Sequence, residues 1–206
     1  AGCKNVRGVG LRGCRLLMPS DFVLLCEIPN LQAVTIDTAQ AGTDVFESLS
    51  QVPGLKTLGI HKVDNTHEFD VRGIASLSSV EELDLSHNAL TLAACEPLRQ
   101  LPSLRRLRIR ATGLPQSDIV RLGMILPKCR IDHDGGELLS SEDRRIGQQQ
   151  VLAWLISLGG TANAVLPSGE TVTVDANTGI PAADVCVQGI AIHDASDADL
   201  RQLEGL

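Results

Sequence analysis

A short hydrophobic phrase recurs at a nearly constant interval through the first two thirds of the sequence. The phrase reads apolar-x-x-apolar-x-apolar, and its copies begin at Val6, Leu31, Leu55, Val80, Leu104 and Cys129. Successive copies lie 25, 24, 25, 24 and 25 residues apart. A fixed period in the twenties is typical of repeat proteins, whose units are too small to bury their own apolar faces and therefore stack on their neighbours. We expect a stack of similar units, each contributing one short strand.

The clearest copy reads Val80-Glu-Glu-Leu83-Asp-Leu85-Ser-His-Asn88-Ala-Leu90. This copy resembles the L-x-x-L-x-L-x-x-N-x-L motif of leucine-rich repeat proteins, and the repeated phrase extends the resemblance over about two thirds of the chain. In the other copies the asparagine position is taken by Cys14, Ala39, Val63 and Thr112. The resemblance implies an α/β leucine-rich repeat solenoid with 24–25-residue repeats of the bacterial type. In that fold parallel strands form the concave face and short helices form the convex face.

Helical segments are expected after three of the strands, over residues 43–52, 91–101 and 117–126, where apolar residues follow helical spacing. Pro97 should bend or shorten the second of these helices. In the sixth copy the second apolar position, residue 132, is occupied by aspartate. We therefore expect an array of about five repeats that ends by residue 135.

Residues 136–206 have a different pattern and are expected to form a helix-hairpin cap and connector. A helix should begin at Ser141 and end before Gly159-Gly160, followed by strands over 162–166, 171–175 and 185–192. A capped helix from Ser196 resembles the opening of a further repeat. The sequence starts with alanine and stops where that repeat would continue, so we expect it to be a fragment of a longer chain.

Composition and charge exclude some classes of function. Residues 1–135 contain 15 Lys/Arg and 15 Asp/Glu, whereas residues 136–206 contain 3 and 10, and aromatic residues make up only 2% of the chain. A nucleic-acid partner is therefore not expected, because neither a basic surface nor stacking rings are available. No apolar stretch is long enough for a membrane span, and no cofactor is expected. Six cysteines without a C-x-x-C pair favour a reducing compartment such as the cytoplasm.

Strand alternation predicts which side chains face outward from the array. On the fourth strand these include Glu82 and Asp84, and on the fifth they are Arg106, Arg108 and Arg110. The acidic and basic sets could form cross-strand ion pairs on a solvated face, contributing roughly 0.2–1 kcal/mol per pair. Alternatively, they could form a charged docking surface. Arg110 is expected to lack an ionic partner because its neighbour is Ser86.

Asp37, His61 and Ser86 share one outward position on three consecutive strands. An acid, an imidazole and a hydroxyl in that order are the components of a nucleophilic triad. An open sheet face offers neither a pocket nor an oxyanion-binding turn, so chance placement is the preferred interpretation.

Two other motifs are given structural interpretations. Gly8-Val-Gly10-Leu-Arg-Gly13 spells the dinucleotide fingerprint, but the predicted strand falls on the motif itself, whereas the fingerprint needs a strand before it. Asp132-His133-Asp134 could ligate a metal, yet no further ligands are in view, so a polar turn is preferred.

The sequence therefore predicts a non-enzymatic module that binds a protein partner through its concave strand face. The candidate contact residues are Asp37, His61, Glu82, Asp84, Ser86, Arg106, Arg108 and Arg110. Three alternatives stay open: a regulatory region of a larger enzyme such as a ligase or kinase, a hydrolase using Asp37, His61 and Ser86, and a structural spacer.

Overall fold

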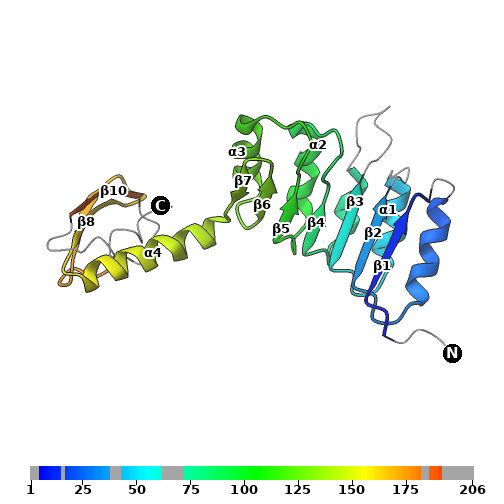
Figure 1. The fold of residues 1–206 in the computed structure, drawn as a ribbon, viewed down its shortest axis with the longest axis horizontal. Helices are drawn as coiled ribbons and strands as arrows, with labels where there is room; N and C mark the ends of the chain where they lie inside the picture. Colours follow the sequence, from blue (N-terminus) through cyan, green and yellow to red (C-terminus); the bar gives the residue numbers. More distant parts are fainter. Residues whose placement is uncertain (1–4, 15–16, 38–42, 62–71, 182–185, 192–206) are drawn as a thin grey trace. The chain divides into compact units, whose positions relative to one another are not determined.

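The computed structural model describes residues 5–14, 17–37, 43–61, 72–181 and 186–191. The chain divides into two compact units, Ala1–Ser140 and Ser141–Leu206 (Figure 1). The first unit extends five residues beyond the array end expected from the sequence. Those residues include a strand that pairs with the last strand of the array.

The first unit contains a seven-stranded sheet in a mixed α/β fold, and the strands follow one another in chain order. Six strands run parallel, and the last pairs antiparallel with the sixth. The strands are β1 (Gly8–Arg12), β2 (Ala33–Asp37), β3 (Thr57–His61), β4 (Glu82–Asp84), β5 (Arg106–Arg108), β6 (Arg130–His133) and β7 (Gly136–Leu138). β1 covers the glycine-rich fingerprint motif itself, as the sequence interpretation required.

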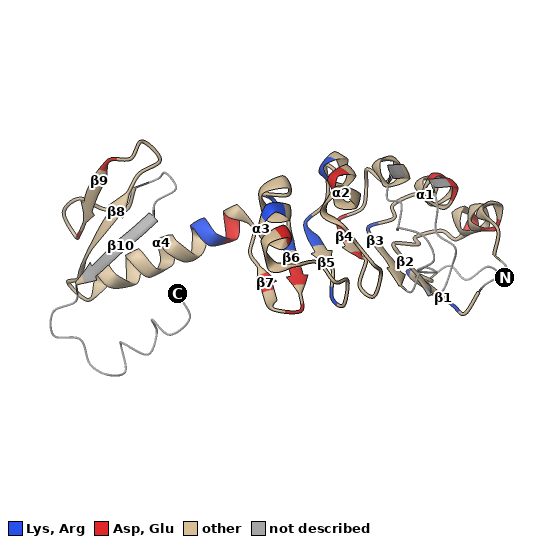
Figure 2. Ribbon diagram, turned by 90° about the horizontal axis from the view of Figure 1, so that it is seen from above, with Lys and Arg blue, Asp and Glu red and all other residues tan. Residues whose placement is uncertain are grey.

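Short helical segments connect the parallel strands and lie along one face of the sheet (Figure 2). They are η1 (Pro19–Glu27), α1 (Thr43–Ser50), η2 (Arg72–Ser76), α2 (Leu92–Cys95), η3 (Glu96–Gln100) and α3 (Gln116–Ile125), where η marks a 3₁₀ helix. The Thr91 side chain caps α2 by accepting a hydrogen bond from Ala94 N at 3.1 Å. Pro97 shortens that helix as predicted: the α-helical part ends at Cys95 and a 3₁₀ turn follows.

The central apolar residues of the repeated phrase form one column across the sheet. In register, the column contains Val9, Val34, Leu58, Leu83, Leu107 and Ile131. From Val34 onward every member is at most 1% exposed, and all belong to a single hydrophobic core with residues of the helical segments. The expectation that equivalent apolar residues align across the sheet is thus confirmed for these strands.

A regular chain of main-chain hydrogen bonds joins the strand starts. Lys56 N donates to Gln32 O, Glu81 N to Lys56 O, Arg105 N to Glu81 O and Arg130 N to Arg105 O, each at 2.8 Å. Because the equivalent peptide group of each repeat bonds to the repeat before it, the spacing between repeats is constant. Outward-facing side chains on neighbouring strands are therefore brought into rows.

The sixth copy forms a strand of the parallel sheet even though residue 132 is aspartate. Ile131 pairs with Leu107, so Ile131 is the second inward residue of the sixth copy. The 25-residue interval predicts residue 132 for that position, one residue later. Ile131 is fully buried, and His133 takes the third inward position with 7% exposure. The parallel sheet therefore gains a sixth strand before β7 turns back along it.

Asn88 connects two neighbouring units from inside the fold. Its side-chain amide donates to Ile60 O at 2.6 Å and to Leu85 O at 2.8 Å, and the residue is 1% exposed. At the same position one unit later, Thr112 Oγ1 donates to Ile109 O at 2.9 Å. The asparagine position of the motif thus supplies donors to carbonyl groups that water cannot reach.

The second unit consists of one long helix and a three-stranded sheet. Its elements are α4 (Ser141–Ser157), β8 (Thr161–Val165), β9 (Thr171–Val174) and β10 (Cys186–Ala191). β8 and β9 pair antiparallel, which confirms the predicted hairpin, and β10 also pairs antiparallel with β8. Leu152 of α4 packs with sheet residues in a small separate core. The helix expected from Ser196, and with it the further repeat, lies outside the described residues.

No helix in the part of the chain that the structure describes combines the length and hydrophobicity needed to cross a bilayer.

Candidate functional site: the charged face of β4 to β6

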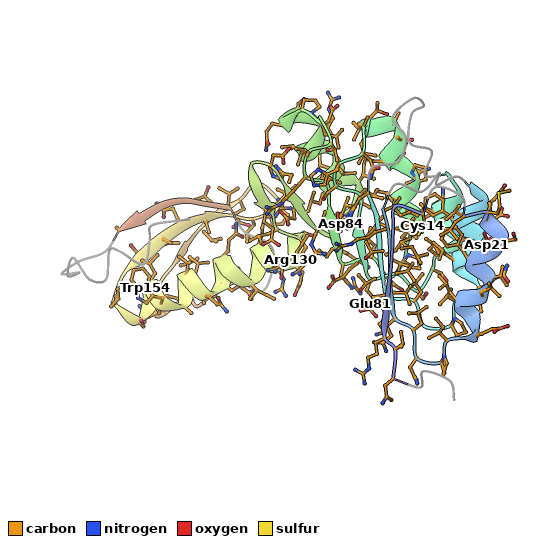
Figure 3. The ribbon with its side chains drawn as sticks, turned by 45° about the vertical axis from the view of Figure 1, so that its right-hand side comes forward. Cys14, Asp21, Glu81, Asp84, Arg130 and Trp154 are labelled. Carbon is orange, nitrogen blue, oxygen red and sulfur yellow. The ribbon has the colours of Figure 1, made fainter. Side chains whose placement is uncertain are left out.

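The outward-facing residues of β4, β5 and β6 form two charged rows across the exposed face of the sheet. One row contains Glu82, Arg106 and Arg130, and the next contains Asp84, Arg108 and Asp132. Neighbouring members lie on strands about 4.8 Å apart. We call these six residues, together with Arg110 two residues after the end of β5, the charged face. Asp84 and Arg130 mark its two sides in Figure 3.

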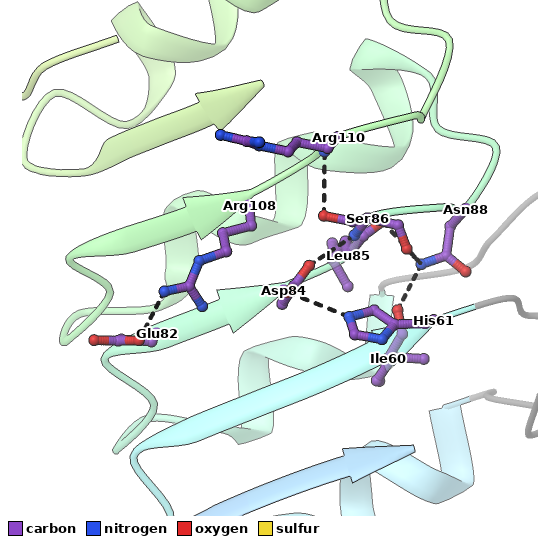
Figure 4. A network of polar contacts seen from close by, with 9 residues as sticks. All are labelled: Ile60, His61, Glu82, Asp84, Leu85, Ser86, Asn88, Arg108 and Arg110. Carbon is purple, nitrogen blue, oxygen red and sulfur yellow. Dashed lines mark hydrogen bonds and ion pairs between the residues drawn. The ribbon is translucent and has the colours of Figure 1, made fainter. Parts of the chain in front are cut away.

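Ion pairs on this face run diagonally instead of directly across the strands. Glu82 lies opposite Arg106 in register, yet its ionic partner is Arg108, whose Nη2 is 3.6 Å from Glu82 Oε2 (Figure 4). Arg130 lies opposite Arg106 and pairs instead with Glu137 of β7, at 4.0 Å. Long arginine side chains can reach diagonal neighbours on a sheet, so strand register alone does not determine the ion pairs.

The expectation that Arg110 lacks an ionic partner is wrong. Its Nε donates to Asp132 Oδ1 at 2.8 Å, and its Nη2 lies 2.7 Å from the same oxygen. This hydrogen bond with Asp132 raises the pKa of Arg110 above its ordinary value. The sequence argument considered only β4, because the phrase count had assigned residue 132 to an inward position.

Arg106 is the arginine of this face that has no ionic partner among the described residues. Its guanidinium forms no ion pair or hydrogen bond with any residue in the described part of the chain. Glu82 is engaged by Arg108, and the neighbour on the other side is another arginine, Arg130. Two like charges therefore lie directly opposite each other on β5 and β6, an arrangement that is locally unfavourable.

Asp84 connects the charged face to His61 and Ser86. His61 Nε2 lies 3.3 Å from Asp84 Oδ2, and Ser86 N donates to Asp84 Oδ1 at 3.0 Å (Figure 4). Burial acts to raise the pKa of Asp84, but hydrogen bonds from the Ser86 side chain and main chain, together with nearby His61, lower it below its ordinary value. Asp84 is therefore a carboxylate at neutral pH.

The proposed triad residues are not connected in the order that the sequence suggests. No hydrogen bond joins His61 to Ser86 in the described structure, and Ser86 Oγ accepts a hydrogen bond from Arg110 N at 3.2 Å. Asp37 ends β2 opposite His61 in register, but its side chain lies outside the described residues. The carboxylate beside the imidazole is Asp84, and the 7% exposed Ser86 links two strand ends.

Asp132, His133 and Asp134 have separate structural roles. Asp132 pairs with Arg110, His133 Nδ1 accepts from Gly135 N at 3.1 Å, and Asp134 accepts from Ala111 N at 2.9 Å. Within the described ranges, no group of three or more His, Cys, Asp or Glu residues is arranged to hold a metal ion. Asp132 and His133 lie on β6 and only Asp134 lies in the turn that leads to β7, so the polar-turn interpretation holds for Asp134 alone.

Three charged residues of this region were missed as contact candidates: Arg130, Asp132 and Glu137. All follow Cys129, the residue that begins the sixth copy of the phrase, where the position expected for the second apolar residue was one residue too late. A 24-residue interval from Leu107 would have identified Ile131 as the inward residue. Arg130 and Asp132, on either side of it, would then have been predicted to face outward.

Comparisons with known proteins do not assign this chain to a family: no protein-family model matches it, and no curated protein is significantly similar to it.

Proposed function

We propose that the first unit is a leucine-rich repeat solenoid that binds a protein partner through the exposed face of its sheet. The observation that carries the proposal is the register of β4, β5 and β6, which aligns their outward charged side chains in rows. Rows held by packed strands present several charges at fixed spacing, which favours recognition of one complementary surface. The apolar column and the Asn88 contacts support the solenoid part of the proposal.

The proposal is tested by reversing charge on the sheet face and comparing it with reversal on the helical side. The variant Arg106→Glu, Arg108→Glu, Arg110→Glu alters only outward positions. A control variant, Arg99→Glu with Arg121→Glu, changes exposed arginines of η3 and α3. Affinity capture with the full chain, followed by direct binding measurements on each purified candidate partner, compares the two variants with the wild type.

We expect the face variant to lose its partner and the control to retain it. Equal binding by wild type and face variant would instead favour a structural spacer. Circular dichroism on all three proteins ensures that a loss of binding is not a loss of folding.

A regulatory region of a larger enzyme, such as a ligase or kinase, would use the same surface for the same kind of contact. The hydrolase alternative has weaker support, because Ser86 bonds to the main chain of Arg110 and no hydrogen bond connects it to His61 in the described structure. An esterase assay on the wild type and on Ser86→Ala tests it: no measurable wild-type turnover eliminates this alternative.

A further inference from the structure

The charged face contains one position where an added anion would remove an unfavourable contact. Of its four arginines, Arg108 pairs with Glu82, Arg110 pairs with Asp132, and Arg130 contacts Glu137. Arg106 has no such partner among the described residues and lies opposite Arg130. The pairing pattern therefore leaves the positive charge of Arg106 without an ionic partner among the described residues, next to the second arginine, Arg130.

We infer that Arg106 and Arg130 together bind a carboxylate side chain from an acidic segment of the protein partner. This inference rests on the proposed function, because it names the chemistry recognised by the same face. A carboxylate has two oxygens and can accept hydrogen bonds from both guanidinium groups, which project from strands about 4.8 Å apart. Arginine is also the cation best suited to such planar, forked contacts.

Charge complementarity selects an acidic segment over a basic one. A basic segment would have to displace Arg108 from Glu82 or Arg110 from Asp132 before it reached a carboxylate of this face. An acidic side chain at Arg106 displaces no described ion pair of that residue. It also reduces the repulsion between two like charges on adjacent strands.

The inference is tested with a fluorescein-labelled peptide rich in Glu, Asp, Gly and Ser. Its matched control has every Glu replaced by Gln and every Asp by Asn. Fluorescence anisotropy measures binding of both peptides to the full chain. We expect the acidic peptide to bind and the amide peptide to bind at least ~10-fold more weakly, a difference of about 1.4 kcal/mol. We also expect added salt to weaken the acidic complex, since the contact is partly exposed.

Variants of the two arginines locate the contact. Arg106→Gln and Arg130→Gln should each weaken the acidic peptide severalfold, while Arg121→Gln on α3 should leave it unchanged. Glu137→Gln should strengthen binding, because it removes the carboxylate that competes for Arg130. If Arg106 had only a structural role, Arg106→Gln would lower the Tm and leave the peptide affinity unchanged. We expect its Tm to be equal to or above that of the wild type, because the like-charge contact is gone.

Several outcomes overturn the inference: equal binding of the acidic and amide peptides, unchanged affinity in Arg106→Gln, or tighter binding of a phosphoserine peptide than of its glutamate counterpart. Self-association of the chain that is lost in Arg106→Gln would also overturn it, since the occupant would then be a second copy. If reversal of the whole face abolishes partner binding while Arg106→Gln with Arg130→Gln does not, the proposed function stands and this inference alone fails.

Discussion

The Asn88 side-chain amide donates a 2.6 Å hydrogen bond to the main-chain oxygen of Ile60, which belongs to the preceding strand. The same amide also bonds to Leu85 O within its own unit, and both contacts are buried. A single side chain therefore donates to carbonyl groups of two adjacent repeats and connects them. The Asn88 hydrogen bond to Ile60 therefore helps to hold the repeat that contains β4 against β3.

Replacement of Asn88 by alanine should strongly destabilise the first unit. The Ile60 and Leu85 carbonyls would lose these buried donors, so we expect a loss of about 2–4 kcal/mol in the free energy of unfolding. Thr112→Ala is the matched comparison, because its hydroxyl serves one carbonyl within its own unit, and it should lose only about 1 kcal/mol. Urea denaturation followed by circular dichroism measures both values. Equal losses of unfolding free energy would show that the Asn88 hydrogen bond to Ile60 adds no stability beyond that of a bond within one repeat.

The diagonal pairing of Glu82 with Arg108 can be measured by a double-mutant cycle. We expect a coupling of about 0.2–0.5 kcal/mol between these two partly exposed residues, since surface ion pairs are weak. The corresponding cycle for Glu82 and Arg106, which lie directly opposite in register, should give a smaller coupling. A larger value for Glu82 with Arg106 would mean that register, and not the diagonal contact, determines the pairing in solution.

Acidification should destabilise the first unit through Asp84. Because its pKa in the folded chain is lowered below the ordinary value of 3.8, its ionised form contributes stability at neutral pH. That contribution is lost as the pH falls through the folded-state pKa. We expect Asp84→Asn to be less stable than the wild type at neutral pH, with the difference shrinking in acid. Denaturant titrations at a series of pH values test this, and a difference that does not change with pH would contradict it.

Two of the cysteines should resist alkylation in the folded protein. Burial raises the pKa of the Cys95 thiol to about 12, and burial, opposed by nearby Arg105, raises that of Cys129 to about 12. Cys14 and Cys26 are only partly buried and should react before Cys95 and Cys129, because the thiolate is the reactive species and access is needed. Iodoacetamide labelling followed by peptide mass spectrometry gives the order. Rapid labelling of Cys95 without denaturant would contradict the predicted core.

The repeated phrase was sufficient to predict five of the parallel strands and the inward column from Val9 to Leu107. Apolar residues at constant spacing can be buried together only if equivalent positions stack, so the period itself carries this information. Local signals also predicted the helix after Thr91, its shortening at Pro97 and the hairpin of β8 and β9. These features depend on neighbouring residues in the sequence, and the structure contains all of them.

The sixth strand and the ion pairs could not be obtained in the same way. The interval before Ile131 shortens by one residue, and a shift of one reverses which side chains face outward on a strand. Arg110 and Asp132 were consequently not considered together, and the ion pairs considered from the sequence were limited to those between the fourth and fifth strands. An arginine side chain is long enough to choose among several carboxylates, so its partner depends on where all of them lie in space.

For this protein, the sequence by itself determined which residues line the core of the repeated units, because burial of apolar surface follows the period of the chain. Only the tertiary structure decided which charges neutralise one another across β4, β5 and β6 and which arginine is left without a described partner. Electrostatic pairing depends on distances between atoms of different strands, and those distances are fixed only when the strands pack in register.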